Sequence, residues 1–403
     1  MTSEEQQNVA GGQGRGHEPR ARYKSVARRT FMRIALLVYS VLFAEGFIRI
    51  FDAQAVMPRY ITGTAWGVRG NIPYSHYWHH TPEVDVEYRI NGQGLRANRE
   101  YSLQKSPGTC RIALFGDSFF FGLEADYQNT FGSLLEQRLR GGGIAAEVLN
   151  FAVGGFGTAE MLQTYEKFGF KFNPDIVIFS WESSDFNDNV RSALYRLQNG
   201  RLERANAAYL PAVGVQDSLM HYAVYRFVAD HSQLYTFVRE RFNRIVKQQL
   251  VGAQKAALGV PQAGDADADR AASDDTDIDE VAHRNKIQLS AAILLRAQDE
   301  IVSSGREFYV VDIPSRLSRT EFASTIGILP ESVRSRIPVV LPLAALTKAA
   351  RPDLKLYYEK GLGHFTPTGT EILVEETRGV LNSSARLAAC RGQSATSSAV
   401  SAR

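Results

Sequence analysis

Short apolar segments alternate with helical segments from about residue 111 onward, and this alternation constrains the fold more than any other feature of the chain. Residues 175–181 (D-I-V-I-F-S-W) are almost continuously apolar, as expected for a strand covered on both faces. The pattern predicts a parallel sheet with helices on both sides, a three-layer α/β/α sandwich. Strands are predicted at 111–115, 147–151, 175–181, 307–313 and 354–358, and helices at 130–139, 158–168, 286–303 and from 366 to 381.

An apolar segment near the N-terminus predicts one transmembrane helix over residues 34–52. Its apolar part is interrupted only by Glu45 and Arg49, which are spaced to pair on one helix face, and 18 helical residues span about 27 Å of bilayer. Seven basic residues precede it against three glutamates, which predicts a cytoplasmic N-terminus in a bacterial inner membrane and a periplasmic or extracellular main domain. Two other interpretations stay open: a cleaved signal peptide ending near Ala55, and a buried or interfacial amphipathic helix.

The predicted organisation places the core domain between two peripheral segments. Residues 1–33 are a basic, disordered cytoplasmic segment, residues 53–106 an extension that packs on the core, residues 107–390 the core domain, and residues 391–403 a disordered tail. The core carries a helical insertion over residues 190–285. Within it, residues 219–246 are predicted as one long aromatic-rich helix, and the Asp-rich residues 252–281 as disordered.

Composition argues against several functions. The net charge of +3 is small for 403 residues, and no basic stripe interleaved with aromatics occurs, so nucleic acid is not an expected partner. The D-x-D-x-D run at 265–269 departs from a calcium loop, with Arg270 at the glycine position and Thr276 at the glutamate position. We predict neither a metal nor a cofactor.

The two cysteines are predicted to lie close together. Cys110 precedes the first core strand and Cys390 follows the last helix. In a doubly wound sheet that helix runs back toward the edge where the first strand begins. We predict a Cys110–Cys390 disulfide if the domain is exported, with two thiols as the open alternative.

Four loops that follow predicted strands supply the chemistry. Ser118 lies in F-G-D-S-F (115–119), a glycine-rich loop occupies residues 150–158, Ser184 follows the third strand, and His364 lies in G-H-F-T-P (363–367). All four loops open on the carboxyl edge of the sheet, where ligands bind in open α/β folds. A serine hydroxyl with a histidine base and backbone N–H donors is suited to acyl transfer.

In these segments the chain resembles the SGNH/GDSL hydrolase family, whose blocks are G-D-S, a glycine in N-x-x-V-x-G-x-G-T, an N-D pair and D-x-x-H. The similarity extends over about residues 88–381 apart from the acidic insertion, and includes I-N-G-Q-G-L-R at 90–96, which is similar to a segment of membrane-anchored bacterial members. It implies a flavodoxin-like fold with Ser118 as nucleophile, His364 as base, and Ser118, Gly155 and Ser184 at the oxyanion hole.

Two positions depart from the family pattern. Ser184 replaces the family's asparagine, and Gly361 replaces the aspartate that orients the histidine. Glu359, Asp353 or a backbone carbonyl are alternative partners for the imidazole.

The sequence and the resemblance together predict a membrane-anchored serine esterase or O-acyltransferase without a cofactor. Its expected substrate is an O-acyl group, such as O-acetyl, on an extracytoplasmic glycan or a similar small ester, and envelope polysaccharide machinery is an expected partner. The alternative is a catalytically degenerate envelope protein that binds a glycan or an assembly partner in the same cleft.

Overall fold

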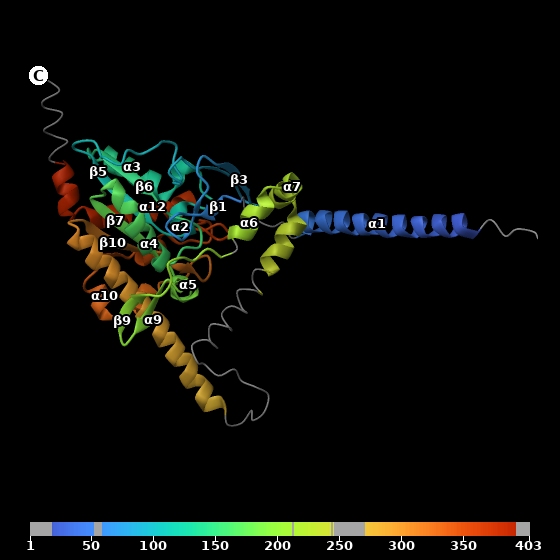
Figure 1. The fold of residues 1–403 in the computed structure, drawn as a ribbon. Coiled ribbons are helices and arrows are strands. Elements are labelled where there is room, and N and C mark those ends of the chain that lie inside the picture. Colours follow the sequence, from blue (N-terminus) through green and yellow to red (C-terminus); the bar gives the residue numbers. More distant parts are fainter. Residues whose placement is uncertain (1–17, 52–58, 212, 243–244, 246–270, 392–403) are drawn as a thin grey trace, which may run out of the picture. The chain divides into compact units, whose positions relative to one another are not determined.

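The computed structural model describes residues 18–51, 59–211, 213–242, 245 and 271–391 (Figure 1). It divides into two units, Met1–Ala53 and Gln54–Arg403, which we describe separately. Of the tail predicted as disordered at 391–403, Arg391 is helical and residues 392–403 lie outside the described residues.

The first unit contains helix α1 (Glu18–Phe51), whose segment Val26–Phe51 is long and apolar enough to cross a membrane or to act as a signal sequence. Arg49 Nε donates to Glu45 Oε1 at 2.7 Å, so the expected pair forms on one helix face. The prediction that residues up to 33 are disordered is wrong for residues 18–33, which continue the helix. Arginine, lysine and alanine are good helix formers, and extending an existing helix avoids a new nucleation step.

The second unit is built on a five-stranded parallel sheet, which confirms the predicted α/β/α fold. Its strand order is β13-β10-β7-β5-β6. The first two core strands in the chain therefore exchange places, which is the flavodoxin-like 2-1-3-4-5 order with its switch point between β5 and β7. The strands are β5 (Cys110–Phe115), β6 (Ala146–Asn150), β7 (Ile176–Trp181), β10 (Glu307–Asp312) and β13 (Val339–Val340).

Helices cover both faces of this sheet and form the two outer layers. Alternate strand residues enter different core clusters: Ile112 and Leu114 pack with α3 (Phe131–Gly141) and α12 (Pro367–Leu381), and Ala113 and Phe115 pack with α4 (Thr158–Lys167) and α9 (Ala271–Ser303). Thr130 caps α3 and Thr366 caps α12 through their side chains, each accepting a backbone N–H of the first turn.

The predicted last strand is wrong. Residues 354–358 make only isolated bridges, Arg351 with Leu354 and Tyr357 with Phe365, and the fifth sheet strand is instead the short β13. Pro338 and Pro342 bound β13, and proline removes a ladder donor, so the strand is confined to two residues at the sheet edge.

The N-terminal extension forms two antiparallel pairs whose inner residues join the core. The pairs are β1 (Ile61–Gly63) with β2 (Arg69–Asn71) and β3 (His76–His80) with β4 (Asp85–Arg89). Along β4, Val86 and Tyr88 are buried and their neighbours are more exposed, because side chains alternate between the two faces of a strand.

The insertion differs from its prediction in two respects. The expected single helix over 219–246 is broken into α6 (Val213–Met220), α7 (Ala223–His231) and a further helical turn. Tyr222 before α7 and Ser232 after it have extended backbones, and the Ser232 hydroxyl accepts from Tyr235 N–H at 3.0 Å to start the next turn. Helix α9 begins at Ala271 and includes 271–281, so the predicted disorder of 252–281 is wrong for this part, and residues 252–270 lie outside the described residues. The acidic first turns of α9 are favoured by the helix dipole.

Short elements complete the unit. They are β8 (Tyr195–Gln198) paired with β9 (Arg201–Arg204), β11 (Ser315–Arg316) paired with β12 (Phe322–Ala323), α2 (Ser118–Phe121), α5 (Asp185–Ser192), α10 (Glu331–Arg334), α11 (Leu343–Ala349), and the 3₁₀ turns η1 (Tyr127–Asn129), η2 (Gly169–Phe172) and η3 (Ile326–Ile328).

The two cysteines lie together as predicted, but as thiols. Cys110 and Cys390 are both buried, and their sulfurs and an Asp175 carboxylate oxygen lie within 4.8 Å of one another. The side chains hydrogen-bond to each other, so the predicted disulfide is absent from the structure. The Lys105 ammonium already pairs with Asp175, which disfavours a metal cation there.

Candidate active site

Ser118 begins the short helix α2 directly after β5. The turn requires a glycine before it, because a Cβ on Gly116 would lie 2.6 Å from Ser180 Oγ and 2.8 Å from Phe120 Cβ. The Asp117 side chain caps α2 by accepting from Phe119 N–H at 2.9 Å. These constraints hold the Ser118 hydroxyl at the carboxyl edge of the sheet.

His364 meets Ser118 across 246 sequence positions. Its Nε2 lies 2.7 Å from Ser118 Oγ, and its ring packs 4.8 Å, centroid to centroid, from Phe119. Gly363, with φ of +81°, turns the chain ahead of the histidine, and Tyr358 N–H donates to the His364 carbonyl at 2.8 Å. The structure thus brings together the two side chains proposed as nucleophile and base.

Glu124 is the residue that sequence analysis missed. Its carboxylate Oε2 lies 3.0 Å from His364 Nδ1 and accepts from His364 N–H at 3.1 Å, while Oε1 accepts from Leu362 N–H at 2.8 Å. Burial alone would raise the pKa of Glu124, but these hydrogen bonds outweigh burial and lower the pKa below its usual value.

An ionised Glu124 fixes the protonation of the imidazole. A carboxylate only accepts hydrogen bonds, so His364 Nδ1 must carry the proton facing it. In a neutral ring Nε2 is then unprotonated and accepts from the Ser118 hydroxyl. This is the arrangement in which a histidine removes a serine proton.

Gly361 explains why the partner comes from elsewhere in the chain. A Cβ at position 361 would lie 1.6 Å from Glu124 Oε1, so no side chain fits there while Glu124 is present. The Glu124 carboxylate therefore occupies the space that a side chain at 361 would need. Glu124 reaches it from a backbone with φ of +66°, an uncommon conformation for a residue with a side chain.

The two partners considered from sequence lie elsewhere. The Glu359 carboxylate pairs with the Arg319 guanidinium, with Arg319 Nη2 at 2.7 Å from Oε2, and Asp353 is exposed. Both ring nitrogens of His364 are taken by Ser118 and Glu124, so neither Glu359 nor Asp353 orients the ring. Spacing along the chain suggested local acids, whereas the fold supplies one from 240 positions away.

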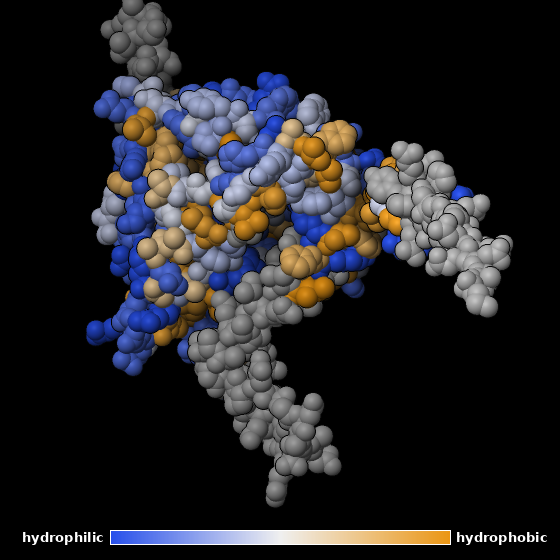
Figure 2. Space-filling model, turned by 45° about the vertical axis from the view of Figure 1, so that its right-hand side comes forward, coloured by the Kyte–Doolittle hydropathy of each residue, from blue (hydrophilic) through white to orange (hydrophobic). Residues whose placement is uncertain are grey.

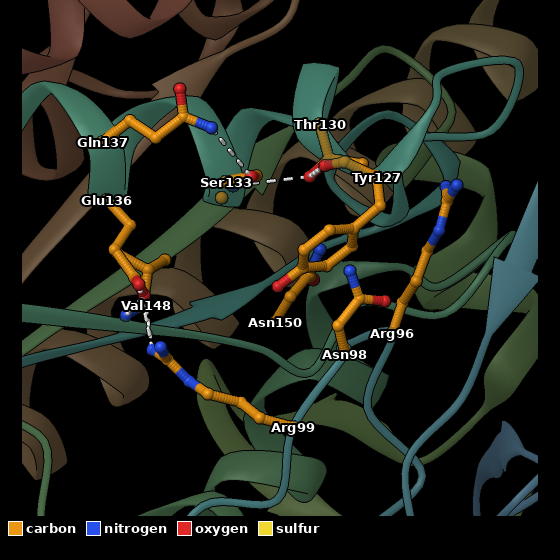
Figure 3. A pocket seen from close by; sticks show the side chains of 11 residues that line it. Arg96, Asn98, Arg99, Tyr127, Thr130, Ser133, Glu136, Gln137, Val148 and Asn150 are labelled. Carbon is orange, nitrogen blue, oxygen red and sulfur yellow. Dashed lines mark hydrogen bonds and ion pairs between the residues drawn. The ribbon is translucent and has the colours of Figure 1, made fainter.

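Arg96 holds the loop that carries Glu124. Its guanidinium donates to the carbonyls of Phe121 at 3.1 Å, Gly122 at 2.5 Å and Ala125 at 2.6 Å, and lies 4.5 Å from the Tyr88 ring centroid. The side chain is buried. A cavity of about 300 Å³ borders this loop, and Figure 3 shows Arg96 on its wall with Tyr127 and Asn150.

The two backbone N–H groups expected at the oxyanion hole are not engaged elsewhere in the described part of the chain. Among the described residues, none accepts a hydrogen bond from the backbone N–H of Ser118 or of Gly155. Gly155 has φ of +78°, and its carbonyl accepts from Arg69 Nη2 at 2.6 Å. Arg69 also pairs with the buried Glu160 at 3.2 Å, which ties the glycine loop to the N-terminal extension.

Ser184 is engaged within its own turn. It precedes α5, its N–H donates to Glu182 Oε2 at 3.1 Å, and its side chain hydrogen-bonds Asp188. Within the described part of the chain, no hydrogen bond joins Ser184 to Ser118 or His364. The hydroxyl is shorter than the family's carboxamide and is engaged inside its own turn.

Buried carboxyl groups lie beneath the serine. Burial, reinforced by the charge of Glu182, raises the pKa of Asp117 to about 7. Burial also raises the pKa of Asp185 well above its usual range, and Asp185 accepts from Thr158 N–H and Glu182 N–H, each at 2.7 Å. Asp185 therefore joins the loops that follow β6 and β7.

Comparisons with known proteins find likeness only in structure. No family model and no curated protein matches the sequence. The chain is similar to a lipolytic G-D-S-L family protein from Veillonella parvula DSM 2008, with 9% identity, 68% of this chain and 99% of that chain covered, and a TM-score of 0.34. It is also similar to an acetyl xylan esterase, AlAXEase, with 12% identity, 67% of this chain and 99% of that chain covered, and a TM-score of 0.33. With TesA the identity is 13%, 67% of this chain and 97% of that chain are covered, and the TM-score is 0.31.

Proposed function

We propose that this protein is a serine-dependent acyl-transfer enzyme that acts on ester bonds. The observation that carries the proposal is the continuous series of contacts from Ser118 Oγ through the His364 ring to Glu124. Glu124 also holds the turn by accepting from Leu362 N–H and His364 N–H, but that structural role does not require its contact with His364 Nδ1. A nucleophile with an oriented base is the arrangement that acyl transfer requires.

In the proposed reaction, Ser118 Oγ attacks the acyl carbonyl while His364 Nε2 takes the hydroxyl proton. Glu124 stabilises the imidazolium that forms, and the N–H groups of Ser118 and Gly155 hold the oxyanion. Collapse of the tetrahedral intermediate releases the alcohol, which receives the proton from His364. Water or an acceptor hydroxyl then attacks the acyl-enzyme, giving hydrolysis or transfer respectively.

The substrate we propose is an O-acyl group, such as O-acetyl, on an extracytoplasmic glycan or a similar ester. The basic segment followed by the apolar part of α1 supports a domain on the far side of a bacterial inner membrane, because such an arrangement favours a cytoplasmic N-terminus. Envelope glycans are ester-bearing polymers in that compartment, and polysaccharide machinery is the expected partner. Neither hydrolysis nor transfer is favoured by the geometry, since both share the acyl-enzyme.

The test uses a fluorophosphonate probe on the full-length protein in detergent, followed by acetate release from an acetylated glycan with and without an unacetylated acceptor. We expect probe labelling that disappears in Ser118→Ala. The matched control is Ser133→Ala, which removes a hydroxyl on α3 that lines the separate cavity of Figure 3. Absence of labelling in folded wild-type protein would favour the non-catalytic binding function and reject this proposal.

A further inference from the structure

Helices α6 and α7 and the residue between them expose a set of large apolar side chains, which we call the stripe. Val215 and Leu219 are spaced i, i+4 on α6, and Val224 and Phe227 are spaced i, i+3 on α7, so each pair shares a helix face. The exposed Tyr222 lies between the two helices. Val224 is 76% exposed and Phe227 is 65% exposed. Figure 2 shows orange, hydrophobic side chains on the face of the molecule that it brings forward. Several exposed large apolar side chains gathered in one short segment indicate a contact site.

The stripe is built on the first residues that follow the anchor segment. Gln216 Nε2 donates to the Ile61 carbonyl at 2.8 Å, and Thr62 Oγ1 lies 3.5 Å from an Asp217 oxygen. In the helical turn that follows α7, the Tyr235 ring centroid lies 5.8 Å from the Arg59 guanidinium, and the charge of Arg59 also acts on Asp230 of α7. The inner side of α6 is therefore held against residues 61 and 62, and α7 lies close to Arg59.

Chain length keeps this region near the membrane. Only seven residues, 52–58, separate Phe51 at the end of the candidate span from Arg59. Seven residues reach at most about 25 Å when fully extended. If α1 crosses the bilayer as proposed, residues 59–63 and the helices packed on them cannot leave the vicinity of its surface.

We propose that the exposed stripe of α6 and α7 lies in the outer leaflet of the bilayer that α1 crosses. The charges suit this occupant. Asp217 and Asp230 are partly buried and face Thr62 and Arg59, whereas Arg226 is exposed on α7 and suits anionic headgroups. Tyr222 adds an amphipathic ring of the kind enriched at membrane interfaces. The domain would thus hold a fixed orientation on the membrane.

The proposal rests on the anchor but goes beyond the proposed acyl transfer, and its test uses no activity readout. Full-length protein is placed in nanodiscs of phosphatidylcholine and phosphatidylglycerol, one copy per disc. A nitroxide is attached at Phe227→Cys, and its collisions with oxygen, which is enriched in lipid, are compared with those of a water-soluble nickel chelate. Wild-type protein treated identically is the blank, because both native thiols are buried.

We expect oxygen collisions to exceed nickel collisions severalfold at Phe227→Cys and at a second site, Tyr222→Cys, which guards against one misfolded variant. A label at Leu37→Cys on α1 reports whether the anchor itself is in lipid. Ser383→Cys is the water-exposed control: it neighbours Ser384, whose hydroxyl bonds Glu307 at the opposite, amino-terminal edge of the sheet. Circular dichroism melting shows that each variant is folded.

The contrary results are distinct. If nickel collisions dominate at Phe227→Cys and Tyr222→Cys while the label at Leu37→Cys is in lipid, the stripe does not lie in the membrane. The anchor and the acyl-transfer proposal are then left intact. Shielding that appears only in discs with two copies assigns the stripe to a second copy of the chain, which also overturns the proposal. A water-exposed Leu37→Cys label overturns both the anchor and the docked stripe.

Discussion

Exchanging the position of the histidine's carboxylate tests the site more sharply than removing it. Glu124 occupies the space of a side chain at position 361, so the two positions are mutually exclusive. Glu124→Ala vacates that space, and Gly361→Asp supplies a carboxylate three residues before His364. Gly361 is not one of the glycines with a positive φ, so aspartate is compatible with its backbone. We therefore expect Gly361→Asp to be harmful in the wild type and beneficial in Glu124→Ala.

The magnitudes follow from the contacts. Loss of the orienting carboxylate costs about 10⁴-fold in a serine–histidine site, or roughly 5.5 kcal/mol of transition-state stabilisation. Glu124→Ala also leaves the N–H groups of Leu362 and His364 without their acceptor, at about 1–3 kcal/mol each in stability. Gly361→Asp alone forces a contact of 1.6 Å to relax, which overpacks the turn by at least about 1–3 kcal/mol.

The assay is the second-order rate of fluorophosphonate labelling, with thermal melting measured on the same samples. The double variant Glu124→Ala/Gly361→Asp should label at least about tenfold faster than Glu124→Ala, since an oriented base contributes about 10²–10⁴-fold. Glu124→Ala/Gly361→Ala is the matched control, because it fills the space without a carboxylate. The reasoning is refuted if the two double variants label at the same rate, or if Glu124→Ala alone retains wild-type labelling.

Three further predictions address the residues around this relay. Arg96→Met should lower the melting temperature and slow labelling, because three buried carbonyls lose their hydrogen-bond donor at about 1–3 kcal/mol each. Arg99→Met makes the same charge change at a more exposed neighbour and should do neither. Equal effects of the two variants would count against a role of Arg96 in holding the Glu124 loop. Gly155→Ala forces alanine to φ of +78° and shifts an oxyanion donor, so the labelling rate should fall about 10²–10³-fold. Gly200→Ala, at φ of +74° in the β8–β9 turn, carries the same backbone strain and should leave the labelling rate unchanged. Burial raises the pKa of Asp117 from 3.8 to about 7, so the folded state binds the Asp117 proton more tightly than the unfolded state does. The contribution of Asp117 to the free energy of unfolding is therefore full below about pH 4 and is lost as the pH rises to 7. Asp117→Asn should therefore gain stability relative to wild type between pH 5 and pH 8 in urea unfolding, and a difference that does not change with pH would contradict the assignment.

The layered fold was readable from the sequence because periodicity reports burial. Strands β5, β6, β7 and β10 are apolar runs bounded by turn residues, and their order along the chain allows few topologies. Boundaries set by local competition were less readable. Residues 219–246 have the composition of one helix, yet extended backbones at Tyr222 and Ser232 break it. The two-residue β13 owes its place to pairing with β10 rather than to any pattern of its own.

The sequence by itself determined the reactive pair: Ser118 follows a strand and a Gly-Asp turn, and His364 precedes the Thr366-Pro367 start of the last helix, both at one edge of a sheet. Only the tertiary structure decided what orients the histidine. Glu124 lies in a loop 240 positions from His364, and its selection depends on a positive φ, an arginine clamp and an empty Cβ position at Gly361. Sequence patterns record local preference and burial, whereas the meeting of a carboxylate with an imidazole across the fold depends on distances that only the folded chain defines.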